Sequence, residues 1–219
     1  MSVSVPIVFY SFVEDAVSRA VVVRLFDSIK RERLGMEIKF ALGHPVVTNG
    51  CGDLRKRAKR FLAAAHSGVN SFFLTDLDTY SAPNDLGKDW FQLECLSQHP
   101  PCFVFRISVR EIESWVMADR GAFARFLGVS SSLLPDQLDD LIDPKQFLLN
   151  LIRTKCKKKC YREMLPMEGQ RVGIGYNSML CDFVSKSWNP ESAAAHSVSL
   201  SRSLRRISEV LKELSLSSC

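Results

Sequence analysis

Apolar residues in the first half of this chain occur in short runs that end abruptly at polar positions. Four of these runs, at residues 5–12, 37–42, 72–78 and 102–109, have the length and the β-branched or aromatic content of strands. Between them, helical spacing is clearest over residues 16–30 and 54–66, and a shorter helix is expected over about residues 90–97, after a turn-rich segment. Strands that alternate with helices predict an α/β fold with about four mainly parallel strands, flanked by helices.

The pattern changes after the fourth run. Residues 126–219 show helical periodicity interrupted by turn-rich segments, and no further strand pattern. We therefore expect an α/β domain over residues 1–125 and a helical C-terminal extension over residues 126–219 that packs on it.

Composition places the chain among ordinary globular proteins. Of its 219 residues, 46% are hydrophobic and 24% charged, and no apolar stretch approaches the length of a membrane span. The first residues lack the basic and apolar regions of a signal peptide, so none is expected. Seven scattered cysteines suit reduced thiols, which favours a cytoplasmic location. The net charge of +5 permits a phosphate-rich partner.

Two aspartates follow the third apolar run directly. Asp76 and Asp78 are separated by one residue, so both side chains point the same way if the strand continues that far. Ligands of parallel sheets sit beyond the carboxyl ends of the strands, and two adjacent carboxylates there favour a cation such as Mg²⁺. The alternative is that both aspartates cap a loop or the next helix.

Three glutamates follow other predicted strands. Glu14 lies where the first strand meets a helix, and it is either a site residue or a partner of the helix dipole. Glu111 stands three residues after Ser108, the spacing of a capping box, which gives it a structural role. Glu113 has no such local role, so it is the better candidate for contact with a metal or substrate.

The predicted helix at residues 54–66 begins with a dense run of basic residues. Such a run is either a solvated helix face or a surface that binds phosphates. On the second interpretation, the residues that contact nucleic acid are Arg55, Lys56, Lys59 and Arg60.

The segments Val13–Ser18, Leu74–Asp78 and Val109–Trp115 resemble the TOPRIM domain, and more specifically a small bacterial TOPRIM-like family related to OLD-type nucleases. The resemblance spans about residues 5–120. It implies phosphodiester chemistry that depends on Mg²⁺ or Mn²⁺, with Glu14 as general acid/base and Asp76 and Asp78 as metal ligands. Glu111 or Glu113 would match the further acids that OLD-type nucleases use for a second metal.

The chain departs from the family pattern at two positions. Asp15 stands where many TOPRIM domains have glycine after the glutamate, and Ser18 stands where OLD-type proteins often have another acid. The first departure bears on the loop geometry and the second on the second metal.

The function that follows is a metal-dependent nuclease with Glu14, Asp76, Asp78 and Glu113 as catalytic residues. DNA is favoured over RNA as the substrate, and no membrane is involved. The resemblance implies an ATPase partner and a role in defence against phage. The chain has no Walker motif of its own. A homo-oligomer is compatible with the sequence. One alternative is a non-catalytic TOPRIM subunit that regulates or assembles a larger complex. A second is a phosphatase of the haloacid-dehalogenase type with Asp76 as nucleophile, although Tyr80 stands where that motif usually has Thr or Val.

Overall fold

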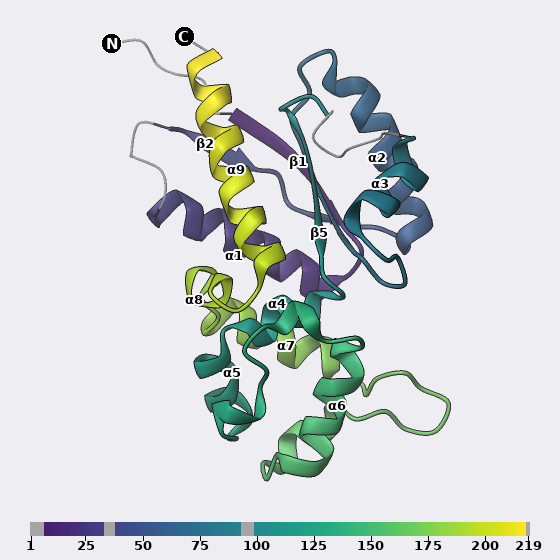
Figure 1. Ribbon diagram of the computed structural model, residues 1–219, viewed down its shortest axis with the longest axis vertical. Helices are drawn as coiled ribbons and strands as arrows, with labels where there is room; N and C mark the ends of the chain where they lie inside the picture. Colours follow the sequence, from purple (N-terminus) through teal and green to yellow (C-terminus); the bar gives the residue numbers. More distant parts are fainter. Residues whose placement is uncertain (1–6, 33–37, 93–98, 218–219) are drawn as a thin grey trace. The chain divides into compact units, whose positions relative to one another are not determined.

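The computed structural model describes residues 7–32, 38–92 and 99–217, and the chain forms two compact units (Figure 1). The first unit extends to Ile107 and includes the chain from Arg202 onward; the second covers Ser108–Ser201. This division differs from the predicted boundary at residue 125. The segment from 108 to 127 packs with the helices that follow it, while the C-terminal helix belongs with the sheet.

The elements of the first unit are β1 (Ile7–Val13), α1 (Ala16–Glu32), β2 (Phe40–Leu42), β3 (Val46–Val47), α2 (Cys51–Ala65), β4 (Ser71–Asp76), α3 (Pro83–Phe91), β5 (Phe103–Ser108) and most of α9 (Val198–Ser217). The strand order is β2-β1-β4-β5, and β3 pairs with β1. β1 is parallel to β2, β3 and β4, so the predicted α/β fold with a parallel sheet is confirmed.

The central strand β4 is buried on both faces, which explains its unbroken apolar run, whereas β1 exposes Val8 and Tyr10 in its first half. Phe72 meets Phe26 of α1 at 5.2 Å between ring centroids, whereas its neighbour Phe73 meets Phe61 of α2 at 5.8 Å. Figure 1 shows α2 and α3 on one side of these strands and α1 and α9 on the other. The α9 helix is tied to β5 by Arg106, whose Nε donates to Ser203 Oγ at 3.1 Å. Phenylalanines thus pack against both faces of β4, within a core that also contains many aliphatic side chains.

Two predicted boundaries in this unit were wrong. The strand at residues 72–78 ends at Asp76, and the helix expected from Trp90 instead begins at Pro83 and ends at Phe91. Proline suits the first turn of a helix because that turn leaves its N–H unpaired anyway, so the turn signal at Pro83 marked a helix start. The rest of the expected helix, at residues 93–97, and the start of the second strand, at Glu37, lie outside the described residues.

The second unit is helical. It contains α4 (Ile112–Ala118), α5 (Arg120–Leu127), the 3-10 turns η2 (Ser131–Leu133) and η3 (Leu138–Asp140), α6 (Pro144–Lys155), η4 (Lys159–Met164), α7 (Tyr176–Lys186) and α8 (Pro190–Ala194). Its core is built around Trp115 of α4, which is fully buried. The Trp115 carbonyl accepts from Trp188 Nε1 at 3.0 Å, and Trp115 Nε1 donates to Ser199 Oγ at 2.7 Å. These bonds tie α4 to chain more than 70 residues away.

Candidate functional site

The carboxyl ends of β1 and β4 form the edge of the sheet at which the sequence predicts a site. From β1 the chain crosses to β2 on one side and later returns to β4 on the other, so the strand order reverses between β1 and β4. Ligands of open α/β sheets bind outside the carboxyl ends of the strands at such a reversal. Glu14 follows β1 directly and Asp76 ends β4, so both acids lie at this point.

The Glu14 carboxylate is held against the end of β4. Its Oε1 accepts hydrogen bonds from Thr75 Oγ1 and from the backbone N–H of Asp76, the latter at 3.3 Å. Burial raises the pKa of Glu14 above its ordinary value; the two hydrogen bonds oppose this, and the charges of Asp78 and Asp15 add to it. A carboxyl group with a raised pKa is suited to exchanging a proton with a reacting group.

The two positions that depart from the TOPRIM pattern form a helix cap. Asp15 Oδ1 accepts a hydrogen bond from the backbone N–H of Ser18 at 2.7 Å, in the first turn of α1. Such a bond satisfies one of the N–H groups left unpaired at a helix start. The turn that presents Glu14 is therefore fixed by a side-chain cap.

Asp76 and Asp78 do not lie on one continuous strand, contrary to the alternation that the sequence suggests. β4 ends at Asp76, Leu77 is buried, and Asp78 turns with a φ of 49° in the left-handed region that aspartate tolerates better than most residues. Asp78 is exposed, and its charge nevertheless raises the pKa of Glu14. A turn, and not strand alternation, thus brings Asp78 toward the same edge.

Cys51 also lies near these acids, which the sequence did not reveal. It is the first residue of α2, which begins three residues before the helix that the sequence predicts over residues 54–66. Partial burial, with the charges of Glu14, Asp78 and Asp76, raises the pKa of the Cys51 thiol to about 11. The short strand β3, which returns the chain to the end of β1 at Val13, positions this loop, and such a two-residue strand leaves little sequence signal.

The donors at this edge suit a hard cation. Across residues 7–32, 38–92 and 99–217, no group of three or more His, Cys, Asp or Glu side chains is arranged to hold a metal ion. Mg²⁺ often takes only one or two carboxylates and keeps several waters. Asp76 and Asp78 offer such oxygens.

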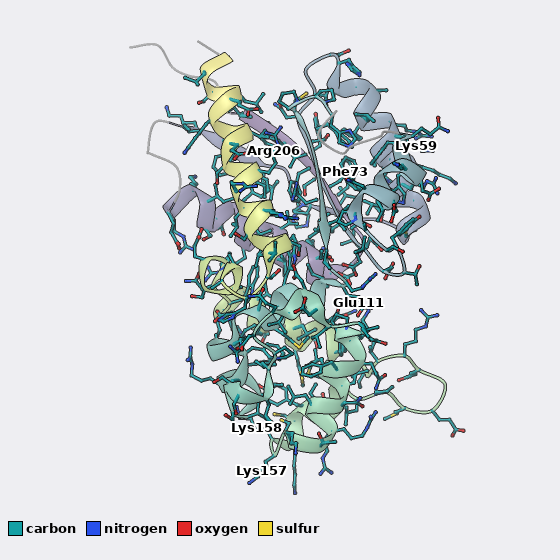
Figure 2. The ribbon with its side chains drawn as sticks, in the orientation of Figure 1. Lys59, Phe73, Glu111, Lys157, Lys158 and Arg206 are labelled. Carbon is teal, nitrogen blue, oxygen red and sulfur yellow. The ribbon has the colours of Figure 1, made fainter. Side chains whose placement is uncertain are left out.

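The basic residues of α2 fall into two groups. Arg55 pairs with Asp89 of α3 at 3.0 Å and Arg57 pairs with Asp53 at 3.1 Å. The second group is exposed and makes neither a hydrogen bond nor an ion pair with any described residue: Lys56, Lys59 and Arg60. Figure 2 shows Lys59 on the outer surface of α2. Three of the four predicted phosphate contacts are thus available, while Arg55 already has a partner.

Glu111 and Glu113 lie in the second unit and have partners there. The predicted capping box is wrong, because α4 begins at Ile112 with Glu111 itself at the capping position. The Glu111 carboxylate instead accepts from the backbone N–H of Lys145 at 3.0 Å, in the first turn of α6, and from Lys145 Nζ at 3.3 Å. The chain therefore uses Glu111 to cap a different helix.

Glu113 is 2% exposed and sits between two helices. Its Oε1 accepts from Tyr176 Oη at 2.9 Å and lies 3.6 Å from Lys145 Nζ, while Oε2 has no partner among the described residues. Burial raises the pKa of Glu113, and the Lys145 ammonium opposes that effect. These contacts give Glu113 a structural role that local sequence did not reveal.

The chain matches no family model, and no curated protein or solved structure was found to match it. The TOPRIM resemblance therefore stays a prediction that rests on the three quoted segments. Among the described helices, none combines the length and apolar content that crossing a bilayer requires.

Proposed function

We propose that this protein is a Mg²⁺-dependent nuclease whose reacting centre lies at the carboxyl ends of β1 and β4. The observation that carries the proposal is the placement of Glu14: its carboxylate binds the backbone of Asp76 at the point where the strand order reverses. Acids on two adjacent parallel strands, at the position where such folds bind ligands, suit a reaction at a phosphodiester.

Glu14 is the candidate proton acceptor. Thr75 and the Asp76 N–H hold Oε1, so the orientation of the carboxylate is set before substrate arrives. The raised pKa of Glu14 increases its affinity for the proton that an attacking water must lose, and the same group can later return that proton to the leaving oxygen.

Asp76 and Asp78 are the residues that would hold the metal. When bound, Mg²⁺ would polarise the phosphate and lower the pKa of a coordinated water. Asp76 is the last residue of β4 and Asp78 lies in the turn that follows it, so both supply carboxylate oxygens at the end of this strand. Two carboxylates so close in the chain favour a bound cation.

The test is cleavage of supercoiled plasmid by the purified full chain with Mg²⁺ or Mn²⁺. We expect metal-dependent nicking that falls by more than about 100-fold in Asp76→Asn, because loss of metal binding removes several kcal/mol of charge stabilisation. Asp85→Asn, an exposed aspartate of α3, is the matched control and should nick normally. Absence of nicking under every metal condition would contradict the nuclease and favour a binding subunit.

The exposed basic residues of α2 would hold the flanking phosphates. Replacing Lys56, Lys59 and Arg60 together with Ala should weaken duplex binding for all sequences alike. The slope of log K against log salt should become shallower by up to about 0.9 for each lost phosphate contact. Arg55→Ala should change this slope little, because Arg55 is already paired with Asp89. An unchanged slope in the triple variant would show that this face is only solvated.

A further inference from the structure

We infer that a cavity between α2 and α3 binds one base of a single-stranded nucleic acid, beside the phosphate-binding face of α2. The inference rests on the proposed function in taking nucleic acid as the ligand, and it adds the form of that nucleic acid. The cavity has a volume of about 430 Å³. It is lined by Lys59, Leu62 and Ala63 of α2 with His66 just after that helix, and by Trp90 and Phe91 of α3 with Gln92 just after it. A volume in this range suits a small organic group.

The walls of the cavity match the chemistry of a nucleobase. Trp90 is almost fully buried and Phe91 half-buried, so an aromatic surface forms the inner side. Phe91 is fixed by edge-on contacts with Phe103 and Phe105, at 5.7 and 5.0 Å between centroids. His66 and Gln92 are exposed at the rim, where an imidazole and an amide can pair with the polar edge of a base. Stacking on aromatic side chains is the usual way in which proteins hold single-stranded bases.

The charge around the cavity favours a phosphate chain. Lys56, Lys59 and Ala63 are spaced by three and four residues, so they lie along one face of α2. Lys59 lines the cavity and makes no ion pair with a described residue. On α3, Asp89 already holds Arg55 at 3.0 Å and accepts from Tyr80 Oη. A base in the cavity would thus have its phosphate next to an available ammonium group.

A base that is paired within a duplex does not fit the cavity. Each base of a duplex is covered on both faces by its neighbours and paired along its edge, so it cannot enter a cavity without leaving the stack. A single strand has no such cost. The α2 helix begins beside the carboxylates at Cys51, and Ala63 lies about 18 Å further along the helix at 1.5 Å per residue. A strand of several nucleotides would span from the cavity to the candidate reacting centre.

The test fills the cavity and measures binding without metal. Ala63 is exposed and lines the cavity, so Ala63→Phe should occupy the space of the base without disturbing the core. Fluorescence anisotropy in EDTA would follow a labelled thymidine oligonucleotide and a hairpin duplex of equal charge. We expect Ala63→Phe to weaken single-strand binding by about tenfold, the usual size of one stacking interaction, and to leave duplex binding unchanged. Ser67→Phe adds the same ring at an exposed position outside the cavity and should bind like the unmodified protein.

Equal single-strand affinity in Ala63→Phe and the unmodified protein would overturn the inference, as would an equal loss in Ser67→Phe. The outcome is separable from that of the nuclease. Single-strand binding that is sensitive to Ala63→Phe, in a protein that never cleaves with any metal, would keep the cavity and remove the nuclease. If cleavage requires Asp76 and single-strand binding is the same in Ala63→Phe as in the unmodified protein, the nuclease proposal stands and the cavity does not bind a base.

Discussion

Glu14 and Glu113 occupy similar places in the sequence and have very different neighbours in the structure. Each follows a strand and stands near a helix start, and burial raises the pKa of both. Glu14 meets a hydroxyl, a backbone N–H and other acids, whereas Glu113 meets a lysine and a tyrosine. A carboxylate whose neighbours are other carboxylates favours binding of an external cation. A carboxylate paired with lysine already has its counter-ion within the fold. The neighbours therefore separate a candidate site from a structural pair better than the position along the chain.

The largest effect should come from exchanging each acid for its amide. Glu14→Gln should lower cleavage by about 10²–10⁴-fold, the usual contribution of a general acid or base, with little change in melting temperature. Glu113→Gln should leave cleavage within a few-fold of normal, because its contacts are to Lys145 and Tyr176. Plasmid nicking rates and thermal melts of both variants give the comparison. A Glu113→Gln protein that melts normally and does not cleave would restore Glu113 as a site residue.

A smaller effect should appear in stability when Lys145 is removed. Lys145→Met leaves the buried Glu113 without its ammonium partner, which should cost about 1–3 kcal/mol of unfolding free energy. Urea unfolding would measure this loss. In the double variant with Glu113→Gln, much of the loss should be recovered, because no buried charge remains unpaired. Additive losses from the two changes would show that the pair is not coupled.

The smallest effect should appear in how stability depends on pH. Both glutamates have a pKa raised above 4.5 in the folded chain, so the native state binds more protons than the unfolded state. The unfolding free energy that they contribute is present below pH 4.5 and falls as the pH rises through each raised folded pKa. Glu14→Gln and Glu113→Gln should each remove part of that fall, as measured by urea unfolding at a series of pH values.

Mg²⁺ should distinguish the two contributions. A bound cation favours the charged form of a nearby carboxylate, so saturating Mg²⁺ should cancel the part of the fall that belongs to Glu14. The part of the fall in unfolding free energy that belongs to Glu113 should persist in Mg²⁺, because Lys145 already forms an ion pair with that carboxylate. If Mg²⁺ leaves both parts unchanged, no cation binds near Glu14.

The sheet could be predicted from sequence because parallel strands buried on two faces leave unbroken apolar runs. Phe72 and Phe73 are such a pair, with one side chain toward each face. The meeting of Glu14 and Asp76 also followed from strand ends, since adjacent parallel strands end at one edge. These inferences needed only local pattern and general topology.

Contacts between distant segments could not be predicted in this way. Tyr176 lies 63 residues from Glu113, and nothing near either residue signals the other. Cys51 approaches the acids because a two-residue strand, too short for periodicity to detect, returns the chain to β1. The capping box failed because Ser108 ends a strand and Glu111 reaches instead to Lys145, 34 residues away. Local rules predicted the elements and missed the partners that distinguish one acid from another.

The position of Cys51 has a practical consequence. Alkylating reagents react with the thiolate, and a pKa near 11 keeps this exposed cysteine almost entirely protonated at neutral pH. Burial is the main cause of this raised pKa and three neighbouring carboxylates add to it, so a cation bound among them should lower the thiol pKa and speed alkylation. The rate at which Cys51 is alkylated would therefore report whether a cation is bound at this site. Mass spectrometry of the peptide that contains Cys51 measures that rate without any cleavage of nucleic acid.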